Sequence, residues 1–190
     1  MRKLVIRFNA PATLTFALLA LGALLLGQTL GSGVTMKYFC VYRSSLADPL
    51  TYLRFFTHVL GHADYSHYMG NMLLLLLVGP PLEEKYGWKK MAWFMAVTAL
   101  VTGLVQFIFF PHTALLGASG IVFMMIVLSS FTESRAGGIP VTLILVVIFY
   151  LGGEIVDGLK GADSVSQLTH VVGGVLGMIF GFLYRGKRHR

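Results

Sequence analysis

Long apolar runs are the feature that most constrains how this chain folds. Six occur along the sequence, and most are close to the roughly 20 residues that a helix needs to cross a hydrocarbon core of about 30 Å. Of the 190 residues, 56% are hydrophobic and 12% are charged, whereas a soluble domain carries about 25% charged residues. The sequence therefore predicts an all-α integral membrane protein. The expected spans are approximately residues 12–30, 65–82, 91–110, 115–131, 139–156 and 165–184.

The first run, Ala12 to Leu30, follows a basic start and has some features of a signal peptide. It is longer than the usual apolar core of about 7–15 residues, and no A-x-A cleavage site follows it. We therefore expect it to be retained as a span. The sequence contains no internal repeat, linker or low-complexity tract, so one membrane domain is predicted over residues 1–190.

Lysine and arginine residues gather on one side of the predicted bundle. Three precede the first span, three lie between the second and third, one lies between the fourth and fifth, and four form the tail, which makes 11 of 15. The positive-inside rule then predicts that both termini are cytoplasmic. The basic tail is interpreted as a topology anchor, and no nucleic-acid partner is expected.

The connection between the first two spans, residues 31–64, is much longer than the others and lies on the outer side in this topology. Long connections usually carry function or structure of their own. Within it, TYLRFFTHVL mixes aromatic residues with Arg54 and His58, which suits the membrane interface. Cys40 is the only cysteine, which excludes an internal disulfide and a cysteine cluster for zinc. We expect neither a metal nor an organic cofactor.

Polar residues inside a span are costly and therefore indicate function. The first group is Gly117-Ala118-Ser119-Gly120, ahead of an apolar run. The glycines permit a sharp turn into a helix, whose first N–H groups can stabilise an oxyanion. From Ser119 to Phe131 the helix would extend only about 20 Å, so it should start below the outer surface. A capped helix or a small-residue packing contact explains this motif alone equally well.

His170 is the second polar group, six residues into the last predicted span. Gly173 and Gly177 follow at four-residue spacing, a pattern that lets another helix backbone come close. If that helix carries Ser119, the imidazole can take the proton of the serine hydroxyl and later protonate the leaving amine. A buried structural histidine is the alternative.

His67 and Asn71 form the third group, at the outer end of the second predicted span. Their spacing of four places both on one helix face, and both side chains can donate hydrogen bonds to an oxyanion. A polar contact between helices is the alternative. Together the three groups supply a nucleophile, a base and oxyanion donors, which are the roles that acyl transfer requires.

These motifs, in this order, resemble those of the rhomboid family of intramembrane serine proteases over nearly the whole chain. The matching motifs are G-x-S-G at residues 117–120, H-x-x-x-N at His67 and Asn71, H-x-x-G-x-x-x-G at His170, Gly173 and Gly177, the earlier histidines His58 and His62, the loop arginine Arg54, and G-x-x-x-E-x-x-x-G at Gly79, Glu83 and Gly87. The resemblance implies a six-transmembrane-helix bundle whose short fourth helix starts at the active serine.

The resemblance also implies roles for individual residues. It implies a Ser119–His170 dyad, with the oxyanion held by Asn71, His67 and the backbone N–H of Ser119. Gly117, Gly120, Phe123, Gly173 and Gly177 would support the site. Gly152 and Gly153 would loosen a substrate gate at the fifth span, while Glu154, Asp157 and Asp163 are expected to be solvated rather than catalytic.

Two positions depart from the family pattern. Many rhomboids have a tyrosine where Phe123 stands, and a tryptophan where Leu53 precedes the loop arginine. Phenylalanine can still stack on the histidine but has no hydroxyl to donate. Neither departure removes a group that the dyad requires, although the leucine predicts weaker anchoring of the loop.

The predicted function is therefore an intramembrane serine endopeptidase that cuts single-span membrane proteins, with its active site open to the outer side of a prokaryotic cytoplasmic membrane. A catalytically inactive rhomboid-like protein that binds transmembrane helices is the main alternative. A small transporter or channel is the other, but it predicts broken helices in paired halves, and the sequence has no such symmetry. The natural substrate and the oligomeric state are not encoded in any recognisable motif.

Overall fold

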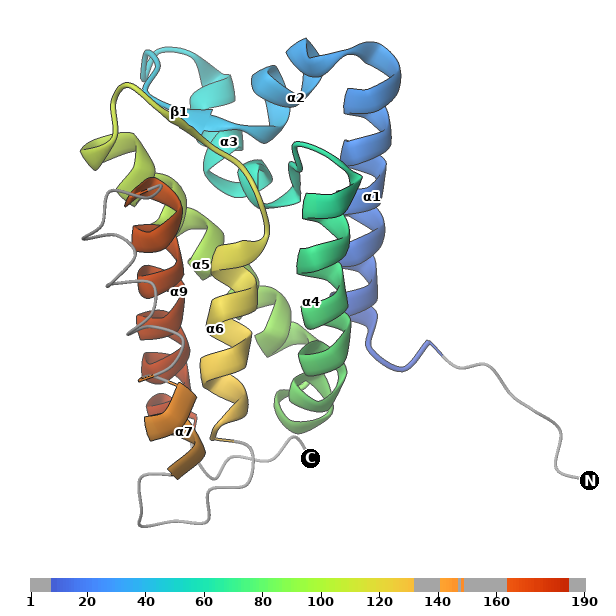
Figure 1. Ribbon diagram of the computed structural model, residues 1–190, viewed down its shortest axis with the longest axis vertical. Coiled ribbons are helices and arrows are strands. Elements are labelled where there is room, and N and C mark those ends of the chain that lie inside the picture. Colours follow the sequence, from blue (N-terminus) through green and yellow to red (C-terminus); the bar gives the residue numbers. More distant parts are fainter. Residues whose placement is uncertain (1–7, 132–140, 147, 149–163, 185–190) are drawn as a thin grey trace, which may run out of the picture.

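A computed structural model describes residues 8–131, 141–146, 148 and 164–184 of the chain. It is mostly helical, which confirms the predicted class (Figure 1). The elements are α1 Pro11–Leu30, α2 Ser32–Phe39, β1 Val41–Tyr42, α3 Pro49–Thr57, the 3-10 turn η1 His58–Leu60, α4 Tyr65–Tyr86, α5 Trp88–Phe109, β2 Ala114–Leu115, α6 Ser119–Ser129, α7 Val141–Val146 and α9 Ser164–Leu183.

Two of the described helices, α1 and α5, are long and apolar enough to cross a membrane by length and composition. Helix α6 and residues 167–183 of α9 are shorter apolar segments. The number of six spans therefore stays a prediction. Most of the fifth predicted span, including the expected gate glycines and the acidic residues after them, lies outside the described residues.

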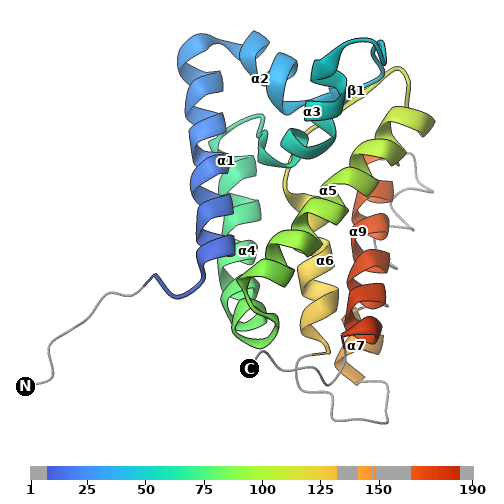
Figure 2. The same cartoon turned by 180° about the vertical axis from the view of Figure 1, so that it is seen from behind.

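Helix α6 occupies the centre of the bundle, between α4, α5 and α9 (Figures 1 and 2). Most of its residues are buried, which fits an α-helix that is apolar on every side. The segment from residue 31 to residue 64, here called the outer segment, lies across one end of the bundle, which we call the outer end. In Figure 1, α6 begins deeper in the molecule than the outer ends of α4 and α9.

The fourth helix starts at the serine, as expected, and the first residues of the predicted span, 115–118, lie ahead of it. Ala114 and Leu115 pair antiparallel with Tyr42 and Val41, so the fold includes a small two-stranded sheet at the outer end. The chain then turns at Gly117, whose φ of +124° lies in a region that glycine adopts without steric cost. The helix begins only at Ser119. Pairing with the outer segment therefore holds the approach to the serine in an extended conformation.

Glu83 fixes the start of α1 to the inner end of α4. Its buried carboxylate accepts hydrogen bonds from the N–H of Ala12 (2.8 Å), the N–H of Thr13 (2.9 Å) and the hydroxyl of Thr13 (2.8 Å). A negative charge at a helix N-terminus also interacts favourably with the helix dipole. Gly79, one turn earlier, leaves no room for a Cβ beside Thr13, and Gly87 (φ +84°) turns the chain from α4 into α5.

Replacing Glu83 with Gln should destabilise the protein by about 1–3 kcal/mol, because one amide oxygen cannot accept from three donors and a buried donor is left unpaired. Glu84→Gln is the matched control, since Glu84 is exposed. Thermal unfolding in detergent can be followed with a thiol-reactive dye, because the only cysteine, Cys40, is buried. Equal melting temperatures for the two variants would contradict this role of Glu83.

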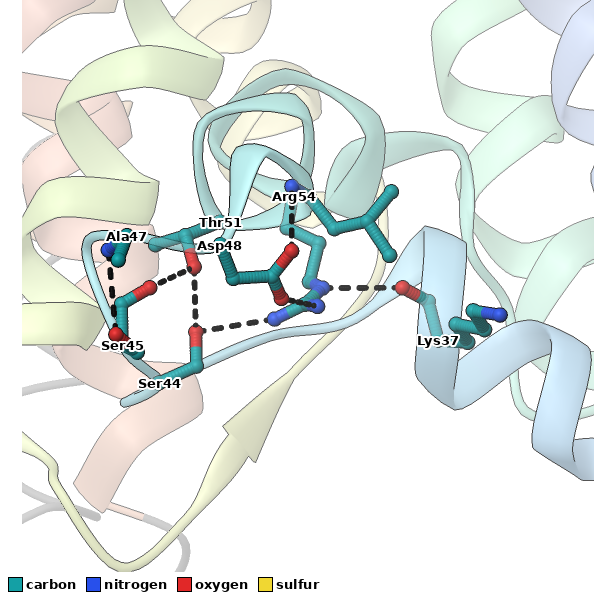
Figure 3. Close-up of polar contacts among 8 residues, drawn as sticks. Lys37, Ser44, Ser45, Ala47, Asp48, Thr51 and Arg54 are labelled. Atoms are coloured by element: carbon teal, nitrogen blue, oxygen red, sulfur yellow. Dashed lines mark hydrogen bonds and ion pairs between the residues drawn. The ribbon is translucent and has the colours of Figure 1, made fainter.

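The outer segment is organised around the buried guanidinium of Arg54 (Figure 3). Its Nε donates to the carbonyl of Lys37 (3.0 Å), Nη1 to the hydroxyl of Ser44 (3.0 Å), and Nη2 to the carboxylate of Asp48 (2.9 Å). The guanidinium also lies over the ring of Tyr42, 4.6 Å from its centroid. One planar cation thus holds α2, β1 and the start of α3 together, which suits the fixed fork of an arginine.

Asp48 is shared between this network and the start of α3. Its other oxygen accepts from the N–H of Leu50 (3.0 Å), which caps the helix. Leu53, which replaces the tryptophan of the family pattern, is exposed. Leu53 therefore does not anchor the outer segment by burial, whereas Arg54 and its partners join α2, β1 and α3.

Candidate active site

Ser119 is half-buried at the first position of α6, where the bundle is covered by the outer segment. Ala118, the residue before it, provides no side-chain cap. The first N–H groups of an α-helix have no partner within the helix. The hydroxyl of Ser119 therefore lies beside backbone donors that suit a developing negative charge.

His58 connects the serine loop to the outer segment and to α5. Its carbonyl accepts from the N–H of Gly117 (3.0 Å). Its ring Nδ1 donates to the carbonyl of Arg54 (3.1 Å), while Nε2 lies 3.3 Å from the hydroxyl oxygen of Thr102. The side chain of His58 is fully buried. The Arg54 network therefore reaches the backbone two residues before Ser119.

The glycines of α9 face α6 at very short range. The position of a Cβ on Gly173 is occupied by the backbone of Gly120, and that on Gly177 by the carbonyl of Met124. A Cβ on Gly120 would lie 3.1 Å from a methyl carbon of Thr169. Each close approach has a glycine of α9 facing the backbone of α6, as the small-residue spacing of α9 predicts.

His170 lies parallel to the ring of Phe123, with the ring centroids 4.2 Å apart and the planes 6° from parallel. Ser119 precedes Phe123 by four residues, so the two lie on the same face of α6, one turn apart. The imidazole therefore packs on the face of α6 that also carries Ser119. The stacking that the sequence allowed for phenylalanine at this position is present.

His67 lies on the opposite side of the serine loop. A Cβ on Gly117 would be 3.0 Å from both Cε1 and Nε2 of the His67 ring. His67 also lies close enough to His170 for an electrostatic interaction between the two rings. Its backbone N–H is fixed by Asp64, which caps α4 at 2.8 Å. His67 and His170 thus approach the start of α6 from two different helices.

Asn71 is buried one turn below His67, and its Nδ2 donates to the carbonyl of His67 (3.1 Å). An amide nitrogen carries two hydrogens, so this bond leaves a second N–H. The structure thus stacks His170 on Phe123 of α6 and brings His67, which is bonded to Asn71, against Gly117.

Sequence reasoning missed Thr102 and Thr169. Thr102 contacts both His58 and the region of Gly120, and Thr169 packs directly against Gly120. Both are buried. A threonine in an apolar helix can satisfy its hydroxyl with the carbonyl of the preceding turn, as Thr102 does with Thr98 (2.8 Å), so its presence gives little sequence signal.

Two histidines of the outer segment are neutral in the folded protein at pH 7. Burial lowers the pKa of His58 to about 4. Burial, and secondarily the nearby His67, lowers the pKa of His62 to about 4; its ring centroid is 5.0 Å from that of His67. Within the described ranges, no three histidine, cysteine or acidic side chains cluster in a way that could hold a metal ion.

Comparison with known proteins identifies the family. The rhomboid domain model matches residues 49–187, well over half of the chain. Rhomboid-related protein 1 of Caenorhabditis elegans is 34% identical over 150 residues, which cover 72% of this chain and 42% of that protein. Rhomboid-related protein 2 of Mus musculus is 28% identical over 158 residues, with 72% and 52% covered. The rhomboid protease GlpG of Serratia proteamaculans (strain 568) is 28% identical over 185 residues, with 95% and 64% covered.

The chain therefore belongs to the rhomboid family, and it is an integral membrane protein built as a helical bundle. It spans about half the length of the curated relatives that it matches, from 42% to 64% of each.

The low pKa values of His58 and His62 predict that stability falls as the pH falls from about 6.5 towards 4. An unfolded histidine has a pKa near 6.5, so in this window the unfolded chain binds more protons than the folded one. His58→Gln should flatten this dependence, whereas His112→Gln, at an exposed position, should not. Melting temperatures measured by tryptophan fluorescence between pH 4 and pH 8 provide the test. An unchanged slope in His58→Gln would contradict the assignment.

Proposed function

We propose that this protein is a serine endopeptidase that cleaves membrane proteins within or beside their transmembrane segments. The observation that carries the proposal is the stacking of His170 on Phe123, one helical turn from Ser119. This arrangement suits a serine nucleophile paired with a histidine base. Family membership and the similarity to the rhomboid protease GlpG support the same conclusion.

In the proposed mechanism, His170 takes the proton of the Ser119 hydroxyl as the oxygen attacks the scissile carbonyl. The negative charge that develops on the carbonyl oxygen is held by the backbone N–H of Ser119 and by the side chains of Asn71 and His67. His170 then protonates the leaving amine, which leaves the acyl group as an ester on Ser119. Water attacks this ester while His170 takes its proton and returns it to the serine oxygen. Phe123 fixes the orientation of the His170 imidazole by stacking on it.

The proposed substrates are single-span proteins with small or helix-breaking residues near the outer membrane boundary. Backbone carbonyls in an intact helix are hydrogen-bonded within it, so the substrate must unwind before attack. The start of α6 below the outer segment favours entry from the outer side. We propose a prokaryotic cytoplasmic membrane as the location. We place both termini in the cytoplasm, because the lysine and arginine residues favour that side.

A fluorophosphonate probe should label the wild-type protein at Ser119, and Ser119→Ala should abolish labelling. His170→Ala should reduce it by at least 10²-fold, because a base of this kind contributes about 10²–10⁴-fold to proton transfer. Ser129→Ala is the matched control, since Ser129 ends the same helix and its hydroxyl is bonded to the carbonyl of Ile126. Intact protein mass spectrometry gives the readout.

The competing function is a rhomboid-like protein that binds transmembrane helices without cutting them. Such a protein needs neither the Ser119 hydroxyl nor the His170 imidazole. Equal labelling of wild-type and Ser119→Ala protein, or none of either in a folded sample, would favour the binding function over the protease.

A further inference from the structure

Residues of α1 and α5, two helices on the face seen in Figure 2, line most of an apolar groove. Its volume is about 410 Å³, and Thr15 is the only polar residue among those that line it. Ala92 and Ala96 of α5 form part of one wall, and both are exposed. Phe56 and Leu60 of the outer segment lie at its outer end. The groove is therefore open to the surroundings of α1 and α5 and separate from the Ser119 side of α6.

The depth of the groove matches one leaflet of a bilayer. From Trp88 at one end to Ala99 at the other, α5 rises roughly 16 Å, which is about half of a hydrocarbon core of about 30 Å. The walls belong to the two helices that are long and apolar enough to span a membrane. A whole helix, about 10 Å wide, is too large for this volume. The dimensions suit a single acyl chain.

A polar hollow of about 260 Å³ adjoins the inner end of the groove and shares Pro11 and Trp88 with it. Glu83 and Glu84 line this hollow, but the Glu83 carboxylate is occupied by the N-terminus of α1. Glu84 is exposed, so its negative charge is accessible to a ligand. Tryptophan is enriched where a membrane meets water, so this end fits the head-group level.

A positive charge lies beside the same tryptophan. Lys89 Nζ is 5.7 Å from the centroid of a Trp88 ring. Lys89 thus places a cation beside Trp88, and Glu84 places an anion in the hollow that Trp88 also lines. This pattern complements a zwitterion, with a phosphate near Lys89 and an ammonium near Glu84. A primary ammonium can also donate hydrogen bonds to the carboxylate, which a quaternary ammonium cannot.

We infer that the groove between α1 and α5 is a binding site for one phospholipid whose head group carries a primary ammonium, as in phosphatidylethanolamine. One acyl chain occupies the groove along Ala92 and Ala96, and the head group lies between Lys89 and Glu84. The inference rests on membrane insertion and does not require proteolytic activity.

Binding of the acyl chain in the groove is tested by native mass spectrometry. The full-length protein is released from micelles to which dioleoyl-phosphatidylethanolamine has been added. The wild type should retain one lipid. Ala96→Phe, which fills the groove, should weaken retention at least tenfold. Leu104→Phe adds a ring at an exposed position of α5 outside the groove, so it should leave lipid retention unchanged. If Ala96→Phe does not fold, Ala92→Phe fills the same wall one turn closer to Trp88. Undiminished retention in a folded filled variant would overturn the site.

The head-group part is tested by comparing phosphatidylethanolamine with phosphatidylcholine and phosphatidylglycerol that carry the same acyl chains. The wild type should retain the first lipid several-fold better than the other two. Glu84→Gln should remove this preference. Lys89→Gln should weaken the retention of all three lipids. Lys37→Gln, at an exposed position of the outer segment, is the control that should change nothing. Equal retention of the three lipids by the wild type would overturn the head-group assignment.

Discussion

The close approach of α6 and α9 is the contact on which the arrangement of this molecule depends. Gly120 meets Gly173, and Gly177 meets the backbone of Met124, without space for a methyl group at either α9 glycine. In an apolar environment the hydrophobic effect does not drive helices together, so packing of this kind has to supply much of the attraction. The same contact sets the distance between Ser119 at the start of α6 and His170 on α9.

The other end of the serine loop is held by the outer segment. Arg54 binds groups of α2, β1 and α3 and holds these elements together. The carbonyl of His58 accepts a hydrogen bond from the N–H of Gly117, which connects them to the serine loop. Gly103 allows α3 to pack on α5, because a Cβ there would be 3.0 Å from the carbonyl oxygen of Phe55. The start of α6 is thus fixed from both sides, by α9 below and by the outer segment above. A nucleophile held in this way needs little reorganisation before reaction.

Much of this arrangement could be predicted from the sequence, because apolar runs and glycine spacing follow directly from helix geometry. The short helix beginning at Ser119 follows from the 13 residues from that serine to Phe131, both included. The close contact of α9 with α6 follows from the spacing of Gly173 and Gly177. The pairing of residues 114–115 with 41–42 was not predictable, since two-residue strands carry no periodicity and their partners lie far apart in sequence. The functions of Glu83 and Arg54 as hydrogen-bonding centres also depend on contacts with α1 and α2 that no local pattern contains.

Cleavage of a single-span substrate is the measurement that tests the central claim most directly. Purified protein in liposomes is incubated with a test substrate, and the cut is mapped by mass spectrometry beside Ser119→Ala and His170→Ala. Our account predicts one cut near the outer membrane boundary by the wild type and none by either variant. Cleavage by His170→Ala at the wild-type rate would contradict the pairing of serine and histidine.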